Sequence, residues 1–243
     1  MNSQVIRNVL DAEELARVRR LIQRSRFVHG SESARGAAEQ VKSNEQLQCT
    51  PEDGRMLAEL VFEALGRHRE FHRLALPLEI SVPLINRYGL GMSYGPHFDR
   101  AFILGANDRQ IRTDLSATLF LSPPEDYDGG ELCIVEDGRN GLVKLDAGNL
   151  ILYPSCMLHS VSAVTRGARL AIIFWVQSMI RDHEQRSLVS NLDRVLGSLA
   201  ERMPGSTEVR DLSGTVNSLT RMWGELGCML AVAALPLVVE MIQ

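Results

Sequence analysis

The sequence predicts a mainly β core flanked by helices, an α+β arrangement, and three observations lead to this fold class. Between about residues 78 and 181, short apolar runs alternate with turn-forming segments such as PPEDYDGG, DGRNG and TRG. Runs of this length with regular turns are typical of a β sandwich or barrel. On both sides of this region, apolar residues recur at helical spacing instead. With 243 residues, 45% of them hydrophobic, the chain can bury a sizeable core.

The first flank, residues 1–77, is expected to be a helical region that packs on the core. Its first helix begins with Asp11 and Glu14 in the spacing of a capping box, and its second begins with Pro51. The polar stretch of residues 31–46 between them predicts a loop. The two predicted helices are residues 11–24 and residues 51–73.

The central region, residues 78–181, is expected to form the β core. In the turn DYDGGEL, Gly129 and Gly130 are expected to supply positive φ angles. Phe174 and Trp175 are expected to point to opposite faces of one strand, with one of them at the border of a pocket. The predicted strands are LEISVPLINRY, SATLFLS, GELCIVED, LVKLDAGNLILYPS, HSVSAVT and RLAIIFWVQS.

The second flank, residues 182–225, has two apolar stripes at helical spacing and predicts two helices. The tail of residues 226–243 is nearly uncharged, but Pro236 and Glu240 interrupt it. Because a membrane-spanning helix needs about 20 apolar residues, this tail is too short, and packing or self-association is the better interpretation. We therefore expect no membrane insertion, and homo-oligomers through these helices or the tail are one expectation.

Charge and cysteine content exclude several classes of protein. The formal net charge is −4, which does not favour nucleic acid as a partner. The four cysteines are far apart and form no C-x-x-C pair, so a zinc ribbon or thioredoxin-type site is not predicted. The charged N-terminal residues do not form a secretory signal. Reduced thiols and a cytoplasmic location are expected.

The segment YGPHFDRAF contains a candidate metal site. His97 and Asp99 are two residues apart, so on a strand their side chains point to the same face. His159, at a strand edge of the predicted core, is the best candidate for a third ligand. Two histidines and one carboxylate form a facial triad, which leaves open the positions that non-heme Fe(II) oxygenases need for a 2-oxo acid and dioxygen.

Arg169 is the candidate for binding the distal carboxylate of 2-oxoglutarate. It stands at the head of an otherwise apolar strand, and a buried arginine is costly without an anionic partner. We expect the strand of HSVSAVT and the strand of RLAIIFWV to form a hairpin that brings Arg169 beside His159.

These residues resemble the Fe(II)/2-oxoglutarate-dependent dioxygenase superfamily, and more narrowly the bacterial prolyl/lysyl-hydroxylase-like (PKHD-type) subgroup. The resemblance implies a distorted double-stranded β-helix (jelly roll), with His97, Asp99 and His159 as iron ligands and Arg169 on the cosubstrate. It further implies Fe(II), 2-oxoglutarate, dioxygen and ascorbate (vitamin C) as cofactors and reactants. The stretches that carry it are VKSNEQL, ALPLEISVPLINRYGLGMSYGPHFD, RTDLSATLFLSPPEDYDGGEL, VKLDAGNLILYPSCMLHSVSAVTRGARLAIIFWVQSMIRD and, more weakly, LDRVLGSL.

The resemblance places one tyrosine near the cosubstrate, and Tyr88 and Tyr94 are both candidates. The expected activity is hydroxylation of an unactivated C–H bond of a peptidyl, amino-acid-derived or other small-molecule substrate, with succinate and carbon dioxide as coproducts. A non-catalytic sensor of iron or 2-oxoglutarate with the same fold is the alternative. A zinc hydrolase would leave Arg169 without a role.

Substrate choice is expected to depend on the loop of residues 102–114, because loops on a rigid barrel usually carry specificity. Within it, Arg112 and Asp114 are predicted either to form an ion pair that pins the loop or to lie on an ordinary surface turn.

Overall fold

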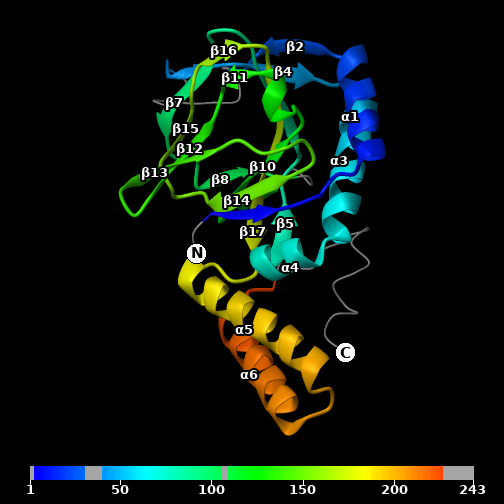
Figure 1. Cartoon of the computed structure of the whole chain (residues 1–243), viewed down its shortest axis with the longest axis vertical. Helices are drawn as coiled ribbons and strands as arrows, with labels where there is room; N and C mark the ends of the chain where they lie inside the picture. Colours follow the sequence, from blue (N-terminus) through cyan, green and yellow to red (C-terminus); the bar gives the residue numbers. More distant parts are fainter. Residues whose placement is uncertain (1–2, 31–39, 106–108, 227–243) are drawn as a thin grey trace.

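Two antiparallel sheets face each other and form a jelly roll, with helices outside it (Figure 1). The computed structural model describes residues 3–30, 40–105 and 109–226. The two sheets and the helices outside them confirm the prediction of a mainly β core with flanking helices. Among the described residues, no helix is long and apolar enough to cross a membrane.

The larger sheet carries Arg169 on β17. Strands that are neighbours in this sheet are mostly not consecutive along the chain. The strands are, from one edge to the other, β1 (Gln4–Ile6), β14 (Leu150–Pro154), β10 (Leu115–Phe120), β17 (Arg169–Ser178), β6 (Leu84–Tyr88), β4 (Glu45–Gln48) and β2 (Arg26–His29), with β5 (Pro77–Ile80) also paired to β17.

The smaller sheet carries both histidines of the candidate metal site. Its strands, in order, are β13 (Arg139–Val143), β12 (Leu132–Glu136), β15 (His159–Val161), β7 (Ser93–His97) and β3 (Lys42–Ser43). Two short strand pairs lie beside the sheets, and a 3₁₀ turn spans Pro124–Asp126. These pairs are β11 (Asp128–Gly129) with β16 (Val164–Arg166), and β8 (Phe102–Leu104) with β9 (Gln110–Arg112).

Both faces of the larger sheet are buried. Because side chains alternate along a strand, residues of the helix-covered core and residues of the cavity are on opposite faces. On β17, Ile172, Phe174 and Val176 enter the core under the helices, whereas Arg169 and Trp175 belong to the opposite face. Strands β10 and β14 alternate in the same way. The expectation that Phe174 and Trp175 point apart is confirmed, and Trp175 is the one that borders the cavity.

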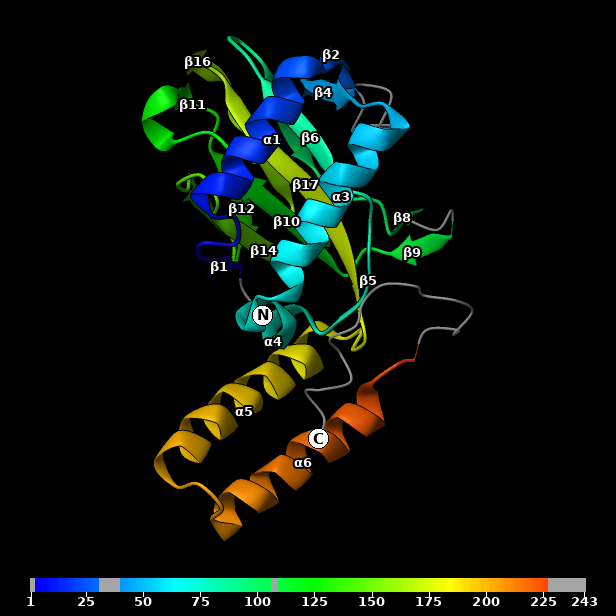
Figure 2. The same ribbon diagram turned by 90° about the vertical axis from the view of Figure 1, so that its right-hand side faces the viewer.

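The N-terminal helices cover the outer face of the larger sheet (Figure 2). The Asp11 side chain accepts a hydrogen bond from the Glu14 backbone, and Glu14 returns one, so the predicted capping box is confirmed. The single helix expected over residues 51–73 is wrong. The chain leaves helical geometry at His68, which is extended, and the imidazole of His68 bonds the carbonyl of Arg7. The observed helices are α1 (Ala12–Arg24), α3 (Pro51–Gly66) and α4 (Arg69–Ala75).

The loop expected over residues 31–46 is wrong where the structure describes it, because β3 and the first half of β4 lie there. These strands are polar because their side chains line the cavity or the surface: Lys42 and Gln46 both face the cavity. Hydrophobic periodicity cannot detect a strand whose inward face is polar. Residues 31–39 are outside the described residues.

The C-terminal helices form a hairpin that projects away from the β sandwich (Figure 1). Helices α5 (His183–Arg202) and α6 (Thr207–Trp223) pack on each other around Val189 and Val216, and α5 also contacts α4. Each of these two helices also exposes apolar side chains, among them Leu188 on α5 and Met222 on α6. The expected role of the tail concerns residues 227–243, outside the described part of the chain.

The first prediction concerns the helix–sheet core. Replacing Phe174 by alanine should lower the free energy of unfolding by about 3–5 kcal/mol, because the fully buried ring leaves a cavity. Leu142→Ala, at a side chain that is 69% exposed on β13, is the control and should change it by less than about 0.5 kcal/mol. Chemical denaturation measures both, and equal effects would contradict the described layering.

Candidate functional site

His97 and His159 are brought together by strand pairing. They are direct partners in the antiparallel pair of β7 with β15, although 61 residues separate them in the sequence. Their ring centroids lie 4.2 Å apart. Both side chains are nearly buried and face the interior of the sandwich. The cross-strand pair thus fixes two imidazoles against each other on the inner face of the smaller sheet.

Each of these histidines is held by a backbone carbonyl two residues before it. Nδ1 of His97 lies 2.8 Å from the oxygen of Gly95, and Nδ1 of His159 lies 3.0 Å from the oxygen of Met157. A carbonyl only accepts, so Nδ1 must donate and the lone pair of the neutral ring is on Nε2. Burial, with the adjacent His159, lowers the pKa of His97 to about 4, so it is neutral at pH 7.

Asp99 completes a cluster of three potential metal ligands. One ligand atom from each of Asp99, His97 and His159 lies within 4.8 Å of the others. Ser116 on β10 donates a hydrogen bond to Oδ2 of Asp99. The Ser155 hydroxyl lies 2.7 Å from that of Ser116 and is buried beside it. Because the Ser116 proton is directed to Asp99, Ser155 donates to Ser116, and this chain of hydroxyls orients the carboxylate.

The expected hairpin between His159 and Arg169 is wrong. Strand β15 pairs with β12 and β7 of the smaller sheet, whereas β17 pairs with β10, β6 and β5 of the larger one. The intervening β16 leaves both sheets to pair with β11. His159 and Arg169 therefore lie on facing sheets, and they meet because both line the cavity between them.

Arg169 is a buried cation without a hydrogen-bond partner. The residue is 1% exposed, and none of its three guanidinium nitrogens has a partner among the described residues. The guanidinium carbon lies 5.3 Å from the ring centre of Tyr88 and 5.2 Å from that of Phe120. Ring faces compensate only part of the cost of burying this charge. The arrangement fits an anion supplied from outside the protein.

Tyr88 and Tyr94, the two candidate tyrosines, both line the cavity but contact different groups in it. Tyr88 on β6 is the direct strand partner of Arg169, and burial raises its pKa to about 12. The ring of Tyr94 instead stacks on that of His97, with ring centroids 3.6 Å apart. Tyr88 therefore lies beside the guanidinium, and Tyr94 lies beside the metal-ligand cluster.

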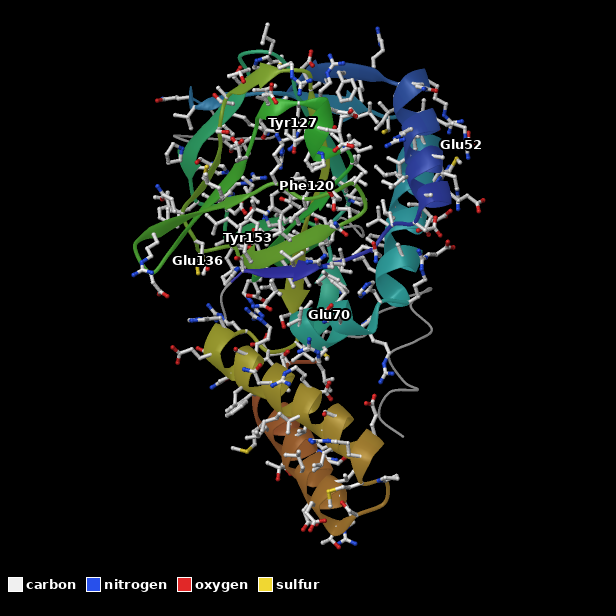
Figure 3. All side chains as sticks on the ribbon, viewed as in Figure 1. Glu52, Glu70, Phe120, Tyr127, Glu136 and Tyr153 are labelled. Carbon is white, nitrogen blue, oxygen red and sulfur yellow. The ribbon has the colours of Figure 1, made fainter. Side chains whose placement is uncertain are left out.

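A single cavity of about 300 Å³ connects Arg169 with the three-residue cluster. The register between β10 and β17 shows how residues are arranged along this cavity. Phe120 pairs with Ala171, close to Arg169, whereas Ser116, which bonds Asp99, pairs with Trp175. Arg169 thus lies at the start of β17, and Asp99 lies near the level of Trp175, towards the other end of that strand. Figure 3 labels Phe120 and Tyr153 among the residues between the two sheets.

Several site residues were not found from the sequence. Ser116 and Ser155 hold Asp99, and the Tyr153 ring packs edge-on against His159 with centroids 5.2 Å apart. Alternation along LILYPS could have assigned Tyr153 to the polar inner face, opposite Leu152. Nothing local marks Ser116, because its role depends on the pairing of β10.

The predicted loop of residues 102–114 contains the strands β8 and β9, with residues 106–108 outside the described part. Of the two interpretations of Arg112 and Asp114, the ion pair is observed. Nε and Nη2 of Arg112 lie 2.6 and 3.0 Å from the two Asp114 oxygens. Arg112 also reaches Glu225, which follows α6, at 3.1 Å. Asp114 accepts a further bond from the Ser178 backbone, so this pair fastens β9 to the end of β17.

The residues present can hold a divalent metal together with an anionic ligand. Two neutral imidazoles with free Nε2 lone pairs and one carboxylate are the donor set of a facial triad. The unpartnered Arg169 offers two parallel N–H groups, the arrangement that binds a carboxylate.

Comparisons with known proteins agree with this chemistry. Residues 83–177 match the family model described as the 2OG-Fe(II) oxygenase superfamily. A PKHD-type hydroxylase of Nitrobacter winogradskyi is 45% identical over 91% of this chain and 99% of its own length. A PKHD-type hydroxylase of Beijerinckia indica is 43% identical over 90% of this chain and 97% of its own.

Solved structures show the same fold at low sequence identity. A prolyl hydroxylase from Trichoplax adhaerens, solved with a hypoxia-inducible-factor peptide, has a TM-score of 0.53 and 17% identity over 77% of this chain and 86% of its own. A viral collagen prolyl hydroxylase from Paramecium bursaria Chlorella virus-1 has a TM-score of 0.51 and 16% identity over 73% of this chain and 97% of its own.

The family named by these matches uses Fe(II) and 2-oxoglutarate, and the cluster of two histidines and Asp99 together with the unpartnered Arg169 fits both groups. The chain belongs to the 2OG-Fe(II) oxygenase superfamily and, within it, to the PKHD-type hydroxylases, and it is an iron- and 2-oxoglutarate-dependent dioxygenase.

Proposed function

We propose that the protein hydroxylates an unactivated C–H bond of a peptidyl, amino-acid-derived or other small-molecule substrate, while 2-oxoglutarate and dioxygen become succinate and carbon dioxide. The observation that carries this proposal is Arg169, a buried guanidinium with no partner among the described residues. It lines the same cavity as the metal-ligand cluster. A zinc hydrolase would use the three metal ligands, but it would have no role for the Arg169 cation. A non-catalytic sensor of iron or 2-oxoglutarate is the alternative that the activity test below distinguishes.

In this proposal, His97, Asp99 and His159 hold Fe(II), and Arg169 holds the distal carboxylate of 2-oxoglutarate with Tyr88 beside it. Iron supplies the activation of dioxygen and the oxidation of the substrate when it is bound. The carbonyls of Gly95 and Met157 keep Nε2 of both imidazoles available, because each accepts the Nδ1 proton.

The remaining residues of the cavity position the reactants. Ser116 bonds one oxygen of Asp99, and Ser155 bonds Ser116. These contacts keep the carboxylate in the orientation needed to bind the metal. The guanidinium of Arg169 fixes the far end of the cosubstrate against the rings of Tyr88 and Phe120. Ile173, Leu132 and similar apolar side chains keep this space free of bulk water, which protects an oxidation from side reactions.

Three further expectations belong to the same proposal. Ascorbate is proposed as the reductant that keeps the iron ferrous. A cytoplasmic location is supported by the free thiols of Cys49, Cys133 and Cys156. Self-association through the C-terminal helices is supported by apolar side chains that α5 exposes, Leu188 and Val195.

The first test removes the carboxylate of the cluster. Asp99→Ala should lower succinate formation under air by at least about a hundredfold, because even residues that only support a metal ligand are worth 10–100-fold. Succinate is measured with Fe(II) and 2-oxoglutarate, with an anaerobic reaction as blank. Asp211→Ala, which removes an exposed carboxylate on α6, is the control and should retain activity. Normal turnover by the Asp99 variant would refute the assignment.

The second test separates a cosubstrate residue from a structural one. Arg169→Leu should weaken 2-oxoglutarate binding by about 30-fold or more, since truncating a buried charge pair costs at least about 2 kcal/mol. The same change should raise the melting temperature of the ligand-free protein, because it removes an uncompensated buried charge. Calorimetry and thermal denaturation give the two readouts.

Arg166→Leu is the matched control for this test, because it removes an exposed cation three residues away that pairs with Asp128. It should leave both readouts nearly unchanged. A destabilised Arg169 variant with normal 2-oxoglutarate affinity would show that Arg169 is structural.

The third test concerns Ser116 as a positioning residue. Ser116→Ala should weaken Fe(II) or Mn(II) binding by about 10–100-fold, the usual effect of losing a hydrogen bond to a metal ligand. Ser116→Thr keeps the hydroxyl and should restore part of this affinity. Ser178→Ala removes another buried serine hydroxyl, which donates to the carbonyl of Leu76 and not to a metal ligand, and should leave metal affinity unchanged. Equal metal affinities of the Ser116 and Ser178 variants would contradict the role.

A further inference from the structure

Tyr127 is a buried tyrosine whose hydroxyl has no hydrogen-bond partner among the described residues. The residue is 0% exposed, although it lies between the 3₁₀ turn and β11 and belongs to neither of the two large sheets (Figure 3). Burying a hydroxyl without a partner costs free energy, and native proteins contain few such groups. The hydroxyl of Tyr127 can therefore bond a group supplied from outside the protein.

The polar neighbour of this hydroxyl is Arg169. Burial raises the pKa of Tyr127, and Arg169 opposes this shift through its charge and its N–H groups, so the two side chains are close together. No well-aligned hydrogen bond joins them, because the hydroxyl and all three guanidinium nitrogens are without a partner among the described residues. Tyr88 and Phe120 present the faces of their rings to the same guanidinium. Of these three aromatic side chains, Tyr127 is the one that offers Arg169 a hydroxyl.

The backbone around Tyr127 is packed too closely for side chains at two glycines. Gly130 has a φ of +67°, and a Cβ there would lie 3.1 Å from the Tyr127 ring. Gly167 has a φ of +68°, and a Cβ there would collide with the carbonyl oxygen of Asp126. The positive φ angles expected for Gly129 and Gly130 are confirmed. This turn thus holds the Tyr127 ring in the interior of the protein.

Lys144 restrains the same tyrosine. Its Nζ donates a hydrogen bond of 2.7 Å to the carbonyl of Tyr127 and lies 4.0 Å from the centre of the Tyr127 ring. The backbone and the ring are therefore both fixed, whereas the hydroxyl has no bond of its own among the described residues. A polar group held in this way binds a ligand with little further loss of conformational entropy.

From this juxtaposition of two buried and unpartnered polar groups, we propose that the Tyr127 hydroxyl completes the site of the distal carboxylate of 2-oxoglutarate. The hydroxyl accepts one N–H group of Arg169 and donates its own proton to a carboxylate oxygen, while the guanidinium binds the same carboxylate. This inference rests on the proposed function, because it takes Arg169 as the residue that binds this carboxylate. Tyr127 is then the tyrosine of this subsite, in place of Tyr88 or Tyr94, the two that the family resemblance offers.

Removal of the hydroxyl tests the proposal. Tyr127→Phe keeps the ring and should weaken 2-oxoglutarate binding about tenfold, because a hydrogen bond to a charged group contributes at least that much. The full-length protein is loaded with Mn(II) and titrated calorimetrically. Without ligand, the variant should melt no lower than the unaltered protein, since it loses a buried hydroxyl that has no partner among the described residues.

Ser178→Ala is the control for the loss of a buried hydroxyl. The Ser178 hydroxyl is hydrogen-bonded to the carbonyl of Leu76, so its removal should lower the melting temperature and leave 2-oxoglutarate affinity unchanged. The two variants should therefore show opposite patterns. If the Tyr127 variant shows the pattern of the Ser178 variant, its hydroxyl is structural.

A second ligand locates the lost contact. 2-Oxopentanoate has the carbon chain and the 2-oxo acid group of 2-oxoglutarate but lacks the distal carboxylate. Its affinity, measured by competition with 2-oxoglutarate, should be the same in Tyr127→Phe and in the unaltered protein, because the hydroxyl has no carboxylate to bond.

A measurement on the unaltered protein covers the case in which the variant does not fold. 2-Oxoglutarate should slow amide hydrogen exchange in residues 124–131 more than 2-oxopentanoate does, because a bond to Tyr127 stabilises this segment. The exposed residues 137–142, which include the turn between β12 and β13, are the control and should respond to neither ligand.

Three results would overturn the proposal: an unchanged 2-oxoglutarate affinity in Tyr127→Phe, an equal loss of affinity for both ligands, or equal effects of the two ligands on exchange in residues 124–131. Failure of the proposed function is recognised separately, because Arg169→Leu would then leave 2-oxoglutarate affinity unchanged. If Arg169→Leu weakens binding and Tyr127→Phe does not, only the role of Tyr127 is wrong.

Discussion

The larger sheet is buried on both faces, and side chains alternate between these faces along each strand. Apolar residues therefore face the helices, and the residues of the site face the cavity. Every second residue of β17 enters the apolar layer beneath α1 and α3, and the others face the cavity. A one-residue slip would expose Arg169 to that apolar layer and Phe174 to the cavity. The helices outside the sheet therefore fix the site inside it, because the burial of Ile172, Phe174 and Val176 holds the register that places Arg169 beside Tyr88.

The metal-ligand cluster is held from three directions. Strand pairing sets His97 against His159, backbone carbonyls orient both rings, and Ser116 of the facing sheet reaches across to Asp99. The Ser155 amide bonds the carbonyl of Asp114, whose side chain is paired with Arg112. Arg112 in turn contacts Glu225, so a series of polar contacts runs from the cluster to the end of the C-terminal hairpin.

Burial of the Arg169 charge in the cavity costs free energy when no ligand is bound. Arg169 is buried with ring faces in place of hydrogen bonds among the described residues. Such groups reduce the stability of a fold, and they are retained where a ligand compensates them. Binding of anions should consequently stabilise this protein more than their contact area suggests, since it also removes an existing penalty.

The sequence by itself determined the local features: the capping box at Asp11, the spacing of His97 and Asp99 on one face, and the isolated Arg169 in an apolar strand. It also indicated the mainly β core, because alternation and turn residues are local. Only the tertiary structure decided which strands are neighbours. The expected hairpin from His159 to Arg169 is replaced by strands in two facing sheets, and the polar strands β3 and β4 gave no periodic signal. Strand pairing depends on burial and hydrogen bonding between distant segments, so only the tertiary structure could assign Ser116 and Ser155 to the site.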